Sequence, residues 1–228
     1  MNRNIIIAVI ALIAALGIGA FMYTGTSDTA DQTAMTEDST TETAADSEAV
    51  SDLPEVTEMT LGDVNAPVKV IEYSSYTCPH CAAFHVEGFG KLKADYIDTG
   101  KVHFTYREVY FDRIGLWASM VARCGGQEKF FGINDLLLKG QKDWLGEGDP
   151  VKIADNLRKI GRVAGLEGDA IDACLEGEAT AQSLIAWYQA NAEEHAIQST
   201  PSFIVDGQLV AGNNYDKVKA AIDARLGE

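Results

Sequence analysis

The sequence predicts an α/β domain that is interrupted by a block of helices. Two observations carry this prediction. Short runs of β-branched and apolar residues occur early and late in the body of the chain, and the long stretch between them has helical spacing. The resulting order is strand, helix, strand, helical block, hairpin and helix, which is typical of an α/β domain with a helical insertion.

An apolar segment precedes this body. Residues 5–23 form 19 apolar or glycine positions without a charge, and Arg3 lies before them. A helix of that length spans about 28 Å, close to the thickness of the hydrocarbon core. We expect residues 1–23 to be a signal peptide or membrane anchor and favour an uncleaved anchor, because residues 18–20 fit a cleavage site poorly. Either segment exports the body and leaves the N-terminus inside.

Residues 24–58 predict a disordered acidic linker. They hold ten acidic residues, no Lys or Arg and few large aliphatic side chains. Such a segment cannot bury enough apolar surface to offset the entropy of ordering it. The body, residues 59–228, carries 24 acidic and 17 basic residues, a net charge of −7. An acidic body argues against nucleic acid as a partner, because phosphate binding needs clustered Lys and Arg.

The first half of the body alternates between strand and helix signals. Residues 66–76 are apolar and β-branched and predict a strand that ends before the first cysteines. Residues 79 to about 97 predict a helix, and residues 101–111 a second strand. These three elements form the first half of the expected α/β domain.

The second half begins with helices and returns to strands. Residues 114 to about 197 have apolar positions at helical spacing, and we expect four or five helices there. After Pro201 the sequence predicts a hairpin that turns at Asp206-Gly207, followed by a closing helix over 215–227.

Cys78 and Cys81, with two residues between them, allow several kinds of site. A metal site would need further ligands, of which His85 is the only neighbour on the same helical face. Covalent haem attachment needs C-x-x-C-H, and residue 82 is Ala. A purely structural disulfide at this spacing would restrain little of the unfolded chain.

Redox catalysis is the interpretation that the local physics favours. Pro79 suits the first position of a helix, which places Cys78 at the N-cap and Cys81 one turn inside. The free N–H groups of the helix N-terminus stabilise a thiolate at Cys78, and His80 can add a donor or a charge. A stabilised thiolate stabilises the reduced form, so the corresponding disulfide is a strong oxidant.

The sequence "CPHC" after a strand, the helical block and "STPSFIVDG" late in the chain together resemble the DsbA family of thiol–disulfide oxidoreductases. The resemblance covers residues 59–228. It implies a thioredoxin fold interrupted by an all-helical insertion at about 113–197. It also implies that Cys78 is the reacting sulfur, and that Thr200-Pro201 is a cis peptide bond beside the active site.

Glu72 is a further candidate, six residues before Cys78 in an otherwise apolar strand. The pattern alone also allows an ordinary carboxylate on an edge strand. The resemblance implies an acidic residue at this place that handles the proton of the second cysteine. A buried Glu would have the raised pKa that this role requires.

Cys124 and Cys174 lie in the helical block. In an exported protein a second disulfide is expected, although two separate buried thiols remain an alternative. In having this extra cysteine pair, the chain resembles the DsbA-like proteins of alphaproteobacteria.

The resulting hypothesis is an exported enzyme of the periplasm, or of the outer face of the cytoplasmic membrane, that donates its Cys78–Cys81 disulfide to reduced cysteine-containing exported proteins. By analogy a DsbB-like membrane quinone reductase recharges it, and we expect a monomer without a cofactor. The alternatives are a disulfide isomerase or reductase of the same fold, since Thr before the proline recurs in isomerases, and a metal-binding module using Cys78, Cys81 and His85.

Overall fold

The computed structural model describes residues 53–228. The predicted anchor, residues 1–23, and all but the end of the predicted linker lie outside the described residues. Within residues 53–228, no helix is long and apolar enough to cross a membrane.

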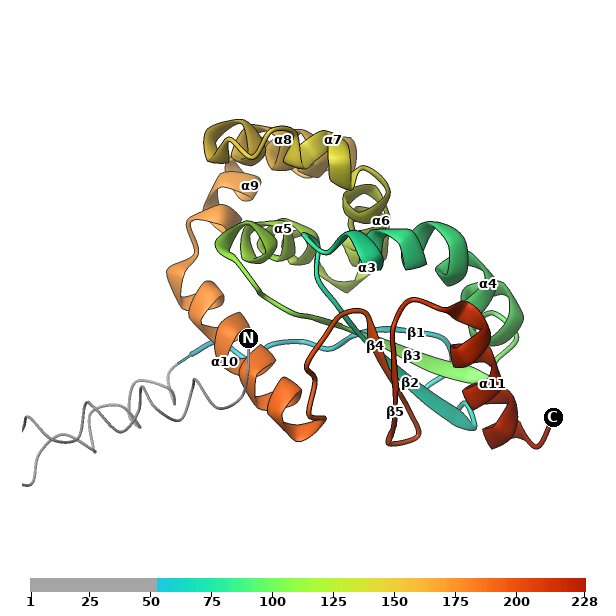
Figure 1. The fold of residues 1–228 in the computed structure, drawn as a ribbon. Coiled ribbons are helices and arrows are strands. Elements are labelled where there is room, and N and C mark those ends of the chain that lie inside the picture. The colour runs from blue at the N-terminus through green and yellow to red at the C-terminus, as the bar shows by residue number, and fades with distance from the viewer. Residues whose placement is uncertain (1–52) are drawn as a thin grey trace, which may run out of the picture. The chain divides into compact units, whose positions relative to one another are not determined.

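A five-stranded mixed sheet forms the centre of the described part (Figure 1). Its order is β1-β3-β2-β4-β5, with β2 and β3 parallel and the other pairs antiparallel. The strands are β1 (Met59–Leu61), β2 (Val68–Ser74), β3 (Val102–Glu108), β4 (Ser202–Val205) and β5 (Gln208–Ala211). β2 is therefore central, and both of the predicted early strands pair with each other.

One face of the sheet is covered by the helix that follows β2 and by the C-terminal helix. The first runs without a break through α3 (Pro79–Phe84), η1 (His85–Phe89), α4 (Gly90–Leu92) and η2 (Lys93–Ile97), and the second is α11 (Tyr215–Leu226). Phe84 from α3 packs on Phe203 of β4 with ring centroids 4.7 Å apart. Val218 and Ile222 of α11 are fully buried in the same core. This core supports the N-terminus of α3, where the two cysteines lie.

Six helices form the insertion between β3 and β4. They are α5 (Arg113–Cys124), α6 (Gly126–Lys139), α7 (Gln141–Leu145), α8 (Pro150–Val163), α9 (Gly168–Leu175) and α10 (Glu178–Glu194). Figure 1 shows α5 to α9 gathered on the same side of the sheet as α3. The predicted fold class is confirmed. The helix number exceeds the expected four or five because α7 is a single short turn between Gly140 and Gly146, which the pattern does not separate from its neighbours.

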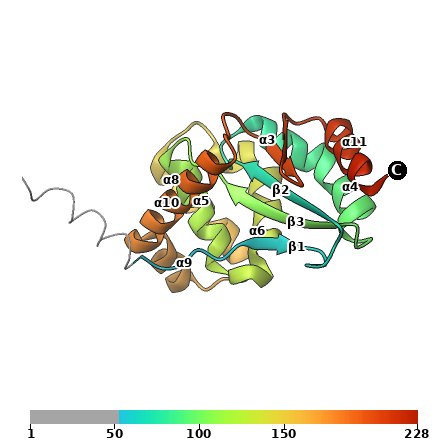
Figure 2. The same cartoon turned by 90° about the horizontal axis from the view of Figure 1, so that it is seen from below.

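The last insertion helix, α10, packs on α5, where its Leu184 joins a buried cluster with Leu116 and Met120, and it also reaches the sheet. Figure 2 shows it alongside the ends of β2 and β3. Its residue Tyr188 and the following Ile197 pack on a small buried cluster of Tyr73, Val109 and Ile204, on the sheet face opposite α3. The chain thus crosses from one face of the sheet to the other before it returns to β4.

The end of the predicted linker belongs to the folded body. Val56 packs on a buried cluster at α5. The Thr57 carbonyl accepts a hydrogen bond from Arg123 at 2.8 Å, and Glu58 pairs with Arg107 at 2.7 Å. Residues 56–58, which the prediction assigned to the linker, thus contact the body through partners that lie far along the chain.

A disulfide joins Cys124, at the end of α5, to Cys174 in α9. The two residues are 50 positions apart, so the closed loop contains α6, α7 and α8. The bond therefore ties the two ends of the insertion core together.

We expect the replacement of Cys124 and Cys174 by Ala to lower the free energy of unfolding by about 4 kcal/mol, because the bond restrains a loop of that length in the unfolded chain. Urea denaturation of the two proteins measures the difference. An unchanged midpoint would show that the bond does not stabilise the fold.

Candidate active site

Cys78 occupies the N-terminus of α3. Its extended backbone (φ −83°, ψ 119°) makes it the N-cap, and Pro79 begins the helix. β2 ends four residues earlier, so the strand delivers Cys78 to the edge of the sheet. The side chain is half-buried and the cysteine is a free thiol. This position leaves the sulfur open to attack and places it at the positive end of the helix.

The pKa of Cys78 is lowered from 9.0 to about 5. The largest cause is the thiol of Cys81, which donates a hydrogen bond to the Cys78 sulfur; partial burial acts in the opposite direction. The Thr200 side chain and the backbone N–H groups of Cys81 and His80 lower the pKa further. Cys78 is therefore a thiolate at neutral pH.

Cys81 differs from Cys78 in its burial and in the direction of its pKa shift. It is fully buried, and burial raises the pKa of its thiol well above the ordinary value, with the hydrogen bond to Cys78 adding to the shift. The backbone N–H of Ser75 approaches its sulfur at 3.4 Å. A substrate can reach Cys78, whereas Cys81 can react only with Cys78.

The segment before β4 closes the site from the other side. The peptide bond between Thr200 and Pro201 is cis. The Cys78 sulfur lies 3.5 Å from the Thr200 carbonyl oxygen and donates to it only when protonated, although the two residues are 122 positions apart. The buried Thr200 hydroxyl has no hydrogen-bond partner among the described residues. It is thus free to donate to a sulfur anion at Cys78.

Glu72 lies on β2, where its neighbours across the sheet are Tyr106 and Phe203. Its side chain is 1% exposed, and neither carboxyl oxygen has a hydrogen-bond partner in the described part of the chain. Burial raises its pKa from 4.5 to about 8, and Ser74 moderates the shift. Glu72 is therefore protonated at neutral pH and can release or take up a proton near pH 8.

Three further buried hydroxyls lie near Glu72 or its neighbour Tyr106, and the sequence did not single them out. The side-chain oxygens of Ser74, Tyr76 and Tyr106 also lack partners within residues 53–228. The pKa of Tyr106 is raised by burial and by the nearby charges of Tyr76, Glu72 and Cys81. A group of polar side chains that includes Ser74 and Tyr106 thus lies close to both Glu72 and Cys81. Only the strand alternation that places residues 72 and 74 on one face could have indicated it.

Gln141 is another site residue that the sequence did not reveal. It is buried at the start of α7, and its side-chain amide donates to the backbone carbonyls of Tyr76 at 2.8 Å and Cys78 at 2.9 Å. The insertion therefore holds the turn that carries the cysteines.

The two histidines near the motif have different surroundings. His80 is exposed, and among the described residues its side chain makes no hydrogen bond. His85 is buried, hydrogen-bonded to Asp135 at 2.9 Å and stacked on Phe89. Across residues 53–228, no three His, Cys, Asp or Glu side chains form a cluster that could hold a metal ion. The geometry gives His85 a structural partner instead of a place beside the cysteines.

The fold and the two cysteines at the start of α3 together define a protein of the thioredoxin class. The chain belongs to the thioredoxin family, whose model matches residues 54–224. Within it the chain is DsbA-like. Its structure superimposes on Wolbachia pipientis alpha-DsbA1 with a TM-score of 0.69 and 27% identity, over 78% of this chain and 96% of that one. It also superimposes on the "protein-disulfide isomerase" of Novosphingobium aromaticivorans with a TM-score of 0.68 and 28% identity, over 75% of this chain and 98% of that one.

Curated relatives carry names from the same chemistry. The "Putative protein-disulfide oxidoreductase" of Rickettsia bellii is 34% identical over 75% of this chain. The match covers 65% of that relative's length, so the chain spans less than two thirds of it. "Disulfide bond formation protein D" of Bacillus subtilis is 28% identical, over 78% of this chain and 82% of the relative.

We expect replacement of Cys81 by Ala to raise the pKa of Cys78 in the reduced protein, because the main hydrogen-bond donor to its thiolate is lost. Replacement by Ser keeps a donor and should raise the pKa less. Thiolate absorbance against pH measures both, with the wild-type midpoint at about pH 5. Equal midpoints for Ala and Ser would show that the Cys81 donor does not control Cys78.

Glu72 should make the oxidised protein less stable as pH rises. The folded state holds its proton up to about pH 8, whereas the unfolded chain loses it near 4.5. The folded state thus binds more protons in this window, and stability falls through it. We expect a loss of about 3 kcal/mol between pH 5 and pH 8 that Glu72→Gln abolishes.

Urea denaturation across that pH range measures the effect, and the oxidised form avoids titration of the two thiols. The exposed Glu87→Gln is the matched control and should keep the wild-type slope. Parallel slopes for wild type and Glu72→Gln would contradict the assignment.

Proposed function

We propose that the protein is an exported thiol–disulfide oxidoreductase that donates a Cys78–Cys81 disulfide to client proteins. The observation that carries the proposal is that the two cysteines differ in accessibility and have pKa values shifted in opposite directions. Cys78 is accessible, with a pKa lowered to about 5, and Cys81 is buried, with a raised pKa. The names of the relatives support the same reaction class.

In the first step a substrate thiolate attacks the Cys78 sulfur of the oxidised enzyme. The Cys78–Cys81 bond breaks, a mixed disulfide forms, and Cys81 leaves with the electron pair. Because the buried Cys81 strongly favours the thiol form, it takes up a proton at once. Glu72, protonated at neutral pH and buried with Ser74, Tyr76 and Tyr106 near Cys81, is the proposed source of that proton.

In the second step another substrate thiolate attacks the substrate sulfur of the mixed disulfide. The substrate gains a disulfide, and Cys78 leaves as a thiolate. A thiolate with a low pKa is a good leaving group, so this step is favourable. The substrate has lost two electrons and the enzyme has gained them. A separate oxidant must then reoxidise the enzyme, and a DsbB-like membrane quinone reductase fits that role by analogy.

The proposed substrates are unfolded or partly folded proteins with reduced cysteines outside the cytoplasm. Support comes from the apolar segment of residues 5–23 and from the DsbA-like fold. The Cys124–Cys174 bond suits an oxidising compartment. We further propose that the protein acts as a monomer.

Disulfide isomerase activity is the second candidate. It is favoured by the name of the Novosphingobium neighbour, at 28% identity, and by Thr200 before the cis proline. An isomerase must keep Cys78 reduced and accessible during its cycle, whereas an oxidase must hold a disulfide. Reactivation of a scrambled disulfide protein by the reduced enzyme separates the two activities.

We expect the oxidised protein to oxidise a peptide that contains two thiols, and Cys78→Ser to abolish the reaction. Cys81→Ala should instead accumulate a mixed disulfide when it is mixed with the disulfide-linked dimer of a single-thiol peptide: the Cys78 thiolate attacks that disulfide, one peptide leaves as the thiol, and the internal thiol that would release the other is absent. Non-reducing mass spectrometry detects the adduct. The Cys124→Ala, Cys174→Ala protein is the control and should remain active. Normal turnover of Cys81→Ala would refute the assigned roles.

A further inference from the structure

Tyr73 lies beside the active site but takes no part in the thiol chemistry. It is fully buried on β2, on the sheet face opposite Glu72. In the strand register it pairs with Ser202, the residue that follows Pro201. The backbone of Tyr73 therefore already holds one end of the segment that contains the cis proline.

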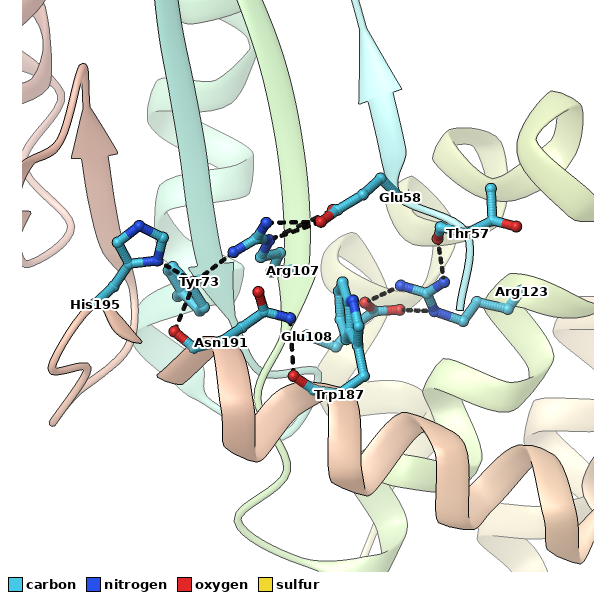
Figure 3. A network of polar contacts seen from close by, with 9 residues as sticks. All are labelled: Thr57, Glu58, Tyr73, Arg107, Glu108, Arg123, Trp187, Asn191 and His195. Carbon is cyan, nitrogen blue, oxygen red and sulfur yellow. Dashed lines mark hydrogen bonds and ion pairs between the residues drawn. The ribbon is translucent and has the colours of Figure 1, made fainter. Parts of the chain in front are cut away.

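The hydroxyl of Tyr73 holds the other end of that segment. It lies 3.0 Å from the Asn191 carbonyl and 2.7 Å from Nδ1 of His195, both at the C-terminal end of α10, and it accepts from Arg107 Nη1 at 2.9 Å (Figure 3). A phenol has one proton and two lone pairs. All three contacts are satisfied when Arg107 and His195 donate to the hydroxyl and the hydroxyl donates to Asn191.

Arg107 is itself held firmly. Its Nη2 and Nε atoms donate to Glu58 Oε1 at 2.7 and 3.1 Å. Its guanidinium carbon lies over the Trp187 ring of α10, 5.8 Å from the ring centroid. Arg123, bound by two hydrogen bonds to the buried Glu108, stacks over the same ring at 5.1 Å (Figure 3). The network thus joins the sheet, α5, α10 and the segment before β1.

The chain between His195 and Pro201 has little freedom left. Ala196 has a positive φ of 50°, and the N–H groups of Ala196 and Ile197 donate back to carbonyls of α10 at 3.1 and 2.8 Å. At the far end Ser202 donates to the Ser199 carbonyl at 2.8 Å. Tyr73 therefore contacts both ends of this short segment, His195 through its hydroxyl and Ser202 through its backbone. Thr200 lies between these two ends.

We propose that Tyr73 is a positioning residue that holds Thr200 and Pro201 against Cys78, with Arg107 and Glu58 as its support. This proposal rests on the proposed redox function, because the expected effect is a change in the stability of the Cys78 thiolate. Without the hydroxyl, the end of α10 loses its tie to β2. The Thr200 side chain and carbonyl, which face the Cys78 sulfur, then lose their fixed place.

The test compares Tyr73→Phe with Tyr110→Phe in the full reduced chain. Tyr110 also makes a hydrogen bond through its hydroxyl, to Ser119 at 2.9 Å, and its ring also packs on α10, against Tyr188. Phe keeps the ring in both variants. Tyr110→Phe therefore controls for the general effect of losing a partly buried phenol hydroxyl near α10.

Two measurements are made on both variants. We expect Tyr73→Phe to raise the midpoint of the Cys78 thiolate titration by up to about one pH unit, the equivalent of one lost hydrogen bond. We also expect faster hydrogen exchange at the amides of Ala196 and Ile197. Tyr110→Phe should change neither.

An unchanged titration and unchanged exchange in Tyr73→Phe would overturn the proposal, and so would equal changes in the two variants. Both readouts are independent of substrate. If wild-type protein oxidises no peptide while the readouts still separate the variants, the positioning role is supported and the proposed function fails.

Discussion

The pairing of β2 with β4 is the constraint on which the redox site depends. Four residue pairs align the strands, from Val70 with Val205 to Tyr73 with Ser202. This register brings Thr200 to Cys78 across 122 positions of sequence. β2 continues directly into the cysteine turn, and β4 follows directly from the cis proline. One short ladder of backbone hydrogen bonds therefore determines the distance between the reactive sulfur and the segment that faces it.

Differences in burial give the two cysteines and the nearby Glu72 different charge states. Cys78 is only half-buried, and hydrogen bonds favour its charged form, so its pKa falls. Cys81 and Glu72 are enclosed, and desolvation favours their neutral forms, so their pKa values rise. Charge is thus concentrated on the outer sulfur and excluded from the interior. The same β2 segment supplies both environments, since Glu72 and Cys78 are only six residues apart.

Local signals predicted the parts of the structure that depend on neighbouring residues. Pro79 indicated the start of α3, and Asp206-Gly207 indicated the hairpin. The sequence could not decide whether Glu72 is buried, because a strand pattern does not say which face is covered. It could not indicate Tyr73, whose partner Asn191 lies 118 positions away, or the short strand β1. These features arise only when distant segments meet.

The order of the cysteines along the chain has a consequence for biosynthesis. A growing polypeptide emerges N-terminus first, so Cys78, Cys81 and Cys124 all appear before Cys174, the partner of Cys124. During that interval three thiols compete for pairing. Closure between Cys78 and Cys81 costs the least chain entropy, because only two residues separate them. Early closure of this pair leaves Cys124 without a wrong partner in its own chain, so the C-x-x-C spacing also favours the native pairing of Cys124 with Cys174.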